Sequence, residues 1–151
     1  MTGLSVVDAH VRLGEKSVLR GVSAVFRPGQ VTTIAGPNGA GKSTLLTLLA
    51  GLRRPDNGQV LIGDEDMFTL PSRLRARRIG YLPQIPEIAW AIDVRTLVGL
   101  GRIPYIGARG LTATDQDAVD RALTAAGVAT MADREVTTLS GGERARVLLA
   151  R

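Results

Sequence analysis

The glycine-rich segment Gly36-Pro-Asn-Gly-Ala-Gly41-Lys42-Ser43 constrains the fold of this chain more than any other feature. It matches the pattern G-x-x-x-x-G-K-[ST], and residues 31–35 before it form a short, almost wholly apolar run that is typical of a strand buried on both faces. Residues 42–49 after it have the composition of a helix that ends at Gly51. Strand, loop and helix in this order are the context in which the pattern marks a phosphate-binding loop.

The residues of this loop suit a nucleotide phosphate. Glycine lets backbone N–H groups converge on phosphate oxygens without a Cβ in the way, and the N-terminus of the following helix presents partial positive charge. Lys42 supplies a compact cation for the β- and γ-phosphates, and the Ser43 hydroxyl can ligate Mg²⁺. An accidental match is expected in only about 1% of chains of this length, so we predict nucleotide binding. The predicted binding residues are Gly36, Pro37, Asn38, Gly39, Ala40, Gly41, Lys42, Ser43 and Thr44.

Composition is that of a folded protein and excludes several kinds of site. Apolar residues make up 44% and charged residues 22% of the 151 residues, which is typical of one globular domain with a sizeable core. The absence of cysteine excludes disulfides and thiolate metal sites, and no apolar run approaches the roughly 20 residues of a membrane span. The net charge of +5 comes from clustered arginines, which we interpret as a solvated surface and not as a nucleic-acid interface.

The rest of the chain predicts an α/β fold followed by a mostly helical segment that begins near residue 85. Strands are predicted at residues 4–13, 18–26, 60–62 and 79–82, the first two as an antiparallel pair. Helices are predicted at residues 94–100, 115–126 and 142–151, the second of them capped by Thr114.

A second motif, Leu139-Ser-Gly-Gly-Glu143, distinguishes among the many proteins that share a phosphate-binding loop. A serine and two small glycines at the start of a helix make a second anion site. The motif resembles the LSGGQ or LSGGE signature of ABC ATPases, and this argues against a P-loop kinase or GTPase. The resemblance implies that Leu139, Ser140, Gly141, Gly142 and Glu143 close on the γ-phosphate of ATP held by the other subunit of a head-to-tail dimer.

Two further stretches are similar to this family. Tyr81-Leu-Pro-Gln84 resembles its Q-loop, which implies that Gln84 reaches Mg²⁺ and the attacking water and that the loop lies beside a membrane partner. Family members usually carry an aromatic residue that stacks on adenine, whereas Leu13 stands in the corresponding stretch here. We therefore expect Leu13 to cover the base with weaker stacking, by up to about 1–3 kcal/mol.

The resemblance implies a P-loop NTPase of ABC ATPase type, with N-terminal antiparallel strands, a helical subdomain and part of the core sheet missing. Its expected domains are a partial ATPase core at residues 1–84, a helical subdomain at 85–138, and the signature motif with the start of its helix at 139–151. The family's Walker B carboxylates and switch histidine follow the signature helix, and the single histidine, His10, is too early for that role. The chain is thus expected to be an N-terminal fragment that neither hydrolyses ATP nor folds stably alone, because strands that would flank residues 31–35 are missing.

A last similarity concerns the transported substrate. Leu97-Val-Gly-Leu-Gly-Arg102-Ile-Pro104 resembles a segment of importer ATPases for haem, iron-siderophores and vitamin B12, with the haem branch as the best match. This implies a peripheral subunit at the cytoplasmic face of the bacterial inner membrane, whose partners are transmembrane permease subunits and, indirectly, a periplasmic binding protein. The alternative is a non-transport ABC ATPase that acts on nucleic acid, which the basic charge favours mildly. The short interval between Gln84 and the signature argues against it, and no nucleic-acid partner is expected.

Overall fold

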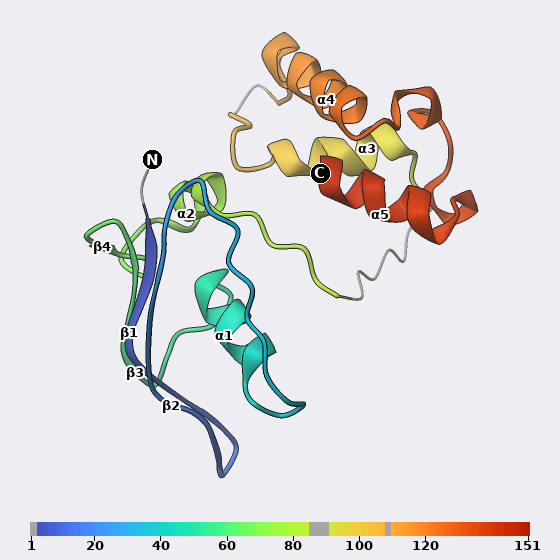
Figure 1. Ribbon diagram of the computed structural model, residues 1–151. Helices are drawn as coiled ribbons and strands as arrows, with labels where there is room; N and C mark the ends of the chain where they lie inside the picture. Colours follow the sequence, from blue (N-terminus) through green and yellow to red (C-terminus); the bar gives the residue numbers. More distant parts are fainter. Residues whose placement is uncertain (1–2, 85–90, 108–109) are drawn as a thin grey trace. The chain divides into compact units, whose positions relative to one another are not determined.

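The computed structural model describes residues 3–84, 91–107 and 110–151, which fold as two compact units, Met1–Gly80 and Tyr81–Arg151 (Figure 1). The first unit contains β1 (Leu4–Leu13), β2 (Lys16–Phe26), α1 (Lys42–Leu49), β3 (Asn57–Ile62), β4 (Glu65–Asp66) and α2 (Ser72–Arg78). The second contains α3 (Val94–Gly99), η1 (Leu100–Arg102), α4 (Ala113–Ala125), η2 (Ala129–Met131), η3 (Val136–Thr138) and α5 (Gly141–Ala150). The predicted α/β fold is confirmed.

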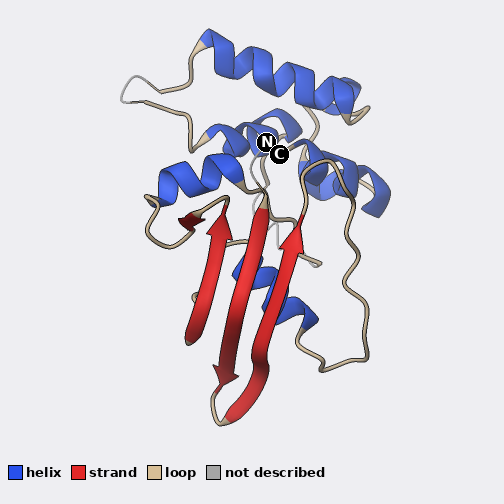
Figure 2. Cartoon of the chain, turned by 60° about the vertical axis from the view of Figure 1, so that its left-hand side comes forward, coloured by secondary structure: helices blue, strands red, loops and turns tan. Residues whose placement is uncertain are grey.

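The first unit is an antiparallel sheet in the order β2-β1-β3-β4, with α1 packed against it (Figure 2). The predicted strand pair is confirmed, with Leu4 opposite Phe26 and Leu13 opposite Lys16. Alternation of buried side chains along β1 changes phase near Asp8, where the register shifts and the backbone of Asp8 adopts a φ of 47°. Gly58 of β3 approaches this point so closely that a Cβ would lie 2.2 Å from the Asp8 carbonyl oxygen, so only glycine fits.

Residues 31–35 do not form the predicted buried strand. They form no β-ladder, and the side chain of Val31 is 99% exposed. A buried strand needs neighbours that satisfy its backbone N–H and C=O groups. The strands in the described part of the chain pair only with one another, so none is left for residues 31–35. The strand predicted at 79–82 is absent as well.

The second unit is helical, and its core is made by α3, α4, α5 and the segments between them. Val98, Leu123, Val136 and Val147 lie in this core. The helix predicted at 115–126 begins earlier, at Ala113, and its cap is Thr112 instead of Thr114. Thr112 is the better cap because Asp115 lies three residues later and completes a capping box. No helix in the described ranges combines the length and apolar character that crossing a bilayer requires.

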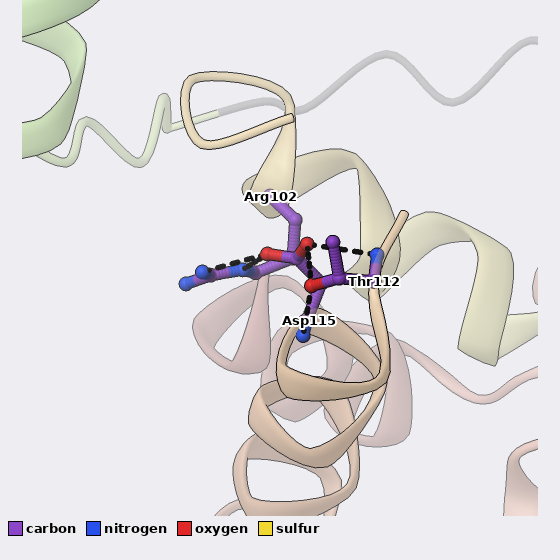
Figure 3. Close-up of polar contacts among 3 residues, drawn as sticks. All are labelled: Arg102, Thr112 and Asp115. Carbon is purple, nitrogen blue, oxygen red and sulfur yellow. Dashed lines mark hydrogen bonds and ion pairs between the residues drawn. The ribbon is translucent and has the colours of Figure 1, made fainter. Parts of the chain in front are cut away.

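A partly buried ion pair joins η1 to the start of α4 (Figure 3). Arg102 donates from Nε and Nη2 to Oδ1 of Asp115 at 2.9 and 2.8 Å, while Oδ2 accepts from the backbone N–H and hydroxyl of Thr112 at 3.0 and 2.7 Å. The Arg102 guanidinium also lies 4.0 Å from the ring centroid of Tyr105. These contacts account for the burial of the Asp115 carboxylate, which is only 5% exposed.

Replacing Asp115 with asparagine is expected to lower the Tm of the protein by about 5 °C, because the charged acceptor of Arg102 is lost. Hydrogen bonds from Thr112, assisted by those from Arg102, lower the pKa of Asp115 from 3.8 to about 2. Since the folded pKa is the lower one, this stabilisation is present above pH 3.8 and is lost as the pH falls towards 2. Urea denaturation of both proteins across this range should show the difference between them shrinking with acid. A constant difference would mean that the carboxylate charge is not what stabilises the unit.

Candidate functional site

The glycine-rich loop opens directly onto the N-terminus of α1. Gly39 and Gly41 have φ values of 81° and 88°, and Gly41 precedes the first helical residue, Lys42. A Cβ on Gly41 would lie 2.8 Å from the Leu19 side chain and 3.2 Å from the Val18 carbonyl oxygen, so the loop can pass β2 only with glycine here. No side chain caps α1, which leaves its first N–H groups available to an anion.

Lys42 points back over this loop. Its Nζ donates to the carbonyl oxygens of Gly36 and Pro37, both at 2.8 Å. These two oxygens are acceptors of the kind that phosphate oxygens would provide. Ser43 follows in the first turn of α1 with its residue exposed, so its hydroxyl is accessible from solvent. The loop therefore holds a cation and a hydroxyl beside uncapped backbone donors.

The signature segment forms the start of α5, with Ser140 as its N-cap. The Ser140 hydroxyl accepts from the Glu143 N–H at 3.3 Å, and the Ser140 N–H donates to Oε2 of Glu143 at 2.8 Å. Hydrogen bonds from the Ser140 hydroxyl and N–H lower the pKa of Glu143 below its ordinary value. Leu139 is buried in the core of the second unit and anchors the segment.

Gly141 and Gly142 are not required by the packing of the described chain. A Cβ on either would meet no atom within 4 Å, and neither residue has a positive φ. Glycine in a helix costs about 0.5–1 kcal/mol relative to alanine. Two glycines that the fold does not need leave an open surface at the start of α5, to which an external group can approach closely.

Gln84 lies in the second unit, on a cleft of about 370 Å³ that it shares with α5. The cleft is lined by Leu82, Pro83, Gln84, Gly141, Arg144, Ala145 and Leu148. The Nε atom of Arg144 is buried without a hydrogen-bond partner in the described chain. Ser43 belongs to the first unit, so a Mg²⁺ site shared by Ser43 and Gln84 stays a prediction.

Leu13 ends β1 opposite Lys16 and is 47% exposed. An exposed leucine at a strand end can cover an apolar surface, but contact with adenine stays a prediction.

Two residues beside these motifs were not predicted. Arg134 has its Nη1 atom 3.7 Å from Oε1 of Glu143, and Arg144 lines the cleft beside Gln84. Neither stands out in the sequence, because arginine is common in this chain and their positions depend on how the helices pack. A larger cavity of about 560 Å³ lies among α3, η1 and α4. Gly99, Leu100 and Ile103 of the segment 97–104 line it, but no residue of the glycine-rich loop or of the signature does.

The chain matches the family model described as ABC transporter over residues 19–151. It is 43% identical to the haemin import ATP-binding protein HmuV of Pseudomonas entomophila, over 98% of this chain and 57% of that protein. It is 45% identical to the cobalamin import ATP-binding protein BtuD of Halobacterium salinarum, over 98% of this chain and 37% of that protein. The chain thus spans less than two thirds of the length of each of these relatives.

Solved structures agree with these similarities. A metal-chelate type ABC transporter in an inward-facing conformation is 29% identical with a TM-score of 0.80, over 99% of this chain and 54% of that one. An ATP-binding cassette of an ABC transporter in its ADP conformation is 26% identical with a TM-score of 0.81, over 100% of this chain and 64% of that one.

Proposed function

The chain belongs to the ABC transporter family, and we propose on that premise that it is part of an importer subunit that binds and hydrolyses ATP to drive uptake. The observation that carries the proposal is that the chain has two helix starts suited to an anion. The first is α1, which follows the glycine-rich loop and has no side-chain cap. The second is α5, whose first two glycines are not needed for packing. One anion site alone would suit many nucleotide-binding proteins. Two of them, in the order of the ABC family, suit a dimer in which each ATP lies between subunits.

In this proposal, residues 36–44 bind the phosphates of ATP. Lys42 exchanges its two carbonyl acceptors for phosphate oxygens, and the uncapped N–H groups of α1 donate to the same anion. The Ser43 hydroxyl and the Gln84 amide oxygen are hard oxygen donors of the kind that Mg²⁺ prefers, and a bound ion would neutralise charge on the β- and γ-phosphates. Leu13 would cover the adenine face.

The signature residues would serve the neighbouring subunit. Ser140 presents an N–H and a hydroxyl at the start of α5, and Gly141 and Gly142 leave room for a phosphate to approach. Leu139 anchors this segment in the helical core, so the donors are held in place. We propose that these residues bind the γ-phosphate held by a second copy in a head-to-tail dimer.

Haem is our preferred transported substrate, with iron-siderophores and cobalamin as alternatives. The support is the similarity to subunits named for haemin and cobalamin import. The proposed partners are transmembrane permease subunits and, through them, a periplasmic binding protein. This assigns the subunit to the cytoplasmic face of the inner membrane.

A nucleic-acid function is less well supported, because three arginines of the first unit already have partners within the fold. Arg53 and Arg54 donate to the carbonyl oxygens of Arg12 and Phe68, and Arg78 pairs with Glu65 at 2.8 Å. These bonds compete with phosphate contacts.

The function is tested by deleting the gene and measuring growth on haemin as the sole iron source. Growth should fail and be restored by the parent gene, but not by a Lys42→Ala version. Parallel cultures on a siderophore and in cobalamin-dependent medium identify the substrate. Normal growth in all three media, together with sensitivity to DNA damage, would contradict import and favour the nucleic-acid alternative.

We further propose that residues 1–151 alone do not turn over ATP. Phosphoryl transfer needs a fixed metal and an oriented water, and only Ser43 and Gln84 are assigned to hold them here. The exposed side chain of Val31 and the unpaired backbone of residues 31–35 also support the expectation that this stretch alone is unstable.

A further inference from the structure

Glu143 occupies the anion site that Ser140 offers. Its Oε2 atom accepts the Ser140 N–H at 2.8 Å, and the Ser140 hydroxyl is used by the Glu143 N–H at 3.3 Å. The Ser140 N–H, one of the donors that would meet a phosphate, is therefore engaged by a residue of the same segment. The hydrogen bonds from Ser140 favour the charged form of this carboxylate, because they lower its pKa.

The open space beside Gly141 and Gly142 shows that this contact does not result from crowding. No described atom would lie within 4 Å of a Cβ at either position, so a phosphate can reach the helix start. On arrival it would compete with the Glu143 carboxylate for the Ser140 N–H, since two anions cannot use the same donor without strong repulsion. Phosphate binding therefore requires the carboxylate to move.

Arg134 lies where the displaced carboxylate can go. Its Nη1 atom is 3.7 Å from Oε1 of Glu143, which is close enough for attraction but too far for a hydrogen bond. The Arg134 backbone is held on both sides, because its N–H donates to Met131 at 2.9 Å and its carbonyl oxygen accepts from Val94 at 3.0 Å. The Glu143 carboxylate therefore has a positive charge beside it that does not belong to the helix start.

We propose that Glu143 is a displaceable cap, which closes the signature site in the nucleotide-free chain and moves onto Arg134 when a γ-phosphate arrives. Arg134 is a positioning residue in this scheme and does not touch the nucleotide. The scheme rests on the proposed function of Ser140. The consequence is selectivity for the anion: anions that bind weakly do not displace Glu143, and only the γ-phosphate that a second subunit presents does.

The test is Glu143→Gln in the full-length subunit, because glutamine retains an oxygen that can accept the Ser140 N–H but removes the charge. Association of two subunits is followed by analytical ultracentrifugation against a non-hydrolysable ATP analogue and against ADP. The analogue concentration at half-association should fall about threefold to tenfold, with no change for ADP. If Glu143 were a structural cap alone, the half-association concentrations of the analogue and of ADP would both stay unchanged. A thermal melt of the variant checks that the helix cap is retained.

Glu65→Gln is the matched control, since it removes one carboxylate that pairs with an arginine, Arg78, on the surface of the first unit. It should leave association unchanged. An unchanged or raised midpoint for Glu143→Gln, or equal tightening with ADP, overturns the displaceable cap while the proposed function stands. If the parent protein does not associate with either nucleotide, the proposed function fails and the cap fails with it.

Arg134→Gln tests the second half of the proposal. Without its guanidinium, the displaced carboxylate keeps only the weaker attraction of Arg146, so analogue-driven association should weaken by about threefold. In the Glu143→Gln background the same change should have no effect, because Arg134 acts only through the carboxylate. Equal weakening in both backgrounds would show that Arg134 contacts the phosphate directly, and this would overturn its role as a positioning residue.

Discussion

Lys42→Ala is expected to weaken ATP binding to the full-length subunit by more than tenfold, equivalent to about 1.4 kcal/mol or more. Lys42 is the only cationic side chain of residues 36–44, and its Nζ already donates to the carbonyl oxygens of Gly36 and Pro37 within that loop. Its loss leaves phosphate charge to the backbone donors of α1 alone. Isothermal titration with ATP and with adenosine would separate the phosphate contribution from that of the base.

Arg20→Ala is the matched control, because it removes one positive charge from an exposed position on β2. It should leave the affinity for ATP within about twofold of the parent value. A loss below tenfold for Lys42→Ala, or an equal loss for adenosine, would show that Lys42 does not hold the phosphates.

Ser140→Arg is expected to abolish ATP hydrolysis by the full-length subunit while nucleotide still binds at the phosphate loop. Arginine cannot accept the Glu143 N–H as the Ser140 hydroxyl does, and its side chain would fill the open space beside Gly141 and Gly142. The partner's γ-phosphate would then be excluded. Steady-state ATPase assays and equilibrium binding of a fluorescent ATP analogue would measure the two effects separately.

Loss of a helix cap is itself destabilising by about 1 kcal/mol, so the control must share this cost. Thr112 caps α4 in the same way that Ser140 caps α5, each with a capping box. Comparing Ser140→Ala with Thr112→Ala therefore isolates the signature site: both should lower the Tm, and only the first should lower ATPase activity. Normal turnover by Ser140→Arg would rule out the dimer in which Ser140 faces the neighbouring nucleotide.

The two motifs were predictable because their structure depends on residues close in sequence. The glycines between Gly36 and Gly41 permit the loop, Lys42 starts a helix, and Ser140 with Glu143 forms a capping box across one turn. The same local logic works for the β1–β2 pair, where the turn places Lys16 opposite Leu13. It failed at Thr114, where two nearby threonines could cap α4 and the position of Asp115 decided in favour of Thr112.

Residues 31–35 mark the limit of this reasoning. Their composition favours a buried strand, but a strand exists only where a second strand supplies hydrogen bonds, and the described chain provides none beside them. Val31 is consequently exposed in spite of its apolar side chain. Composition indicates that a segment favours the strand conformation. Whether the strand forms depends on another strand lying beside it to pair with its backbone.

By itself, the sequence determined the glycine-rich loop before α1, the capped helix α5 and the α/β character of this protein, because each depends on hydrogen bonds within a turn or between strands that adjoin in sequence. Only the tertiary structure decided that Arg102 holds Asp115, that Arg134 lies beside Glu143, and that residues 31–35 have no strand partner in the described chain. These contacts join residues that meet only after helices and strands have packed. Their geometry follows from the packing of whole elements, which no short window of sequence contains.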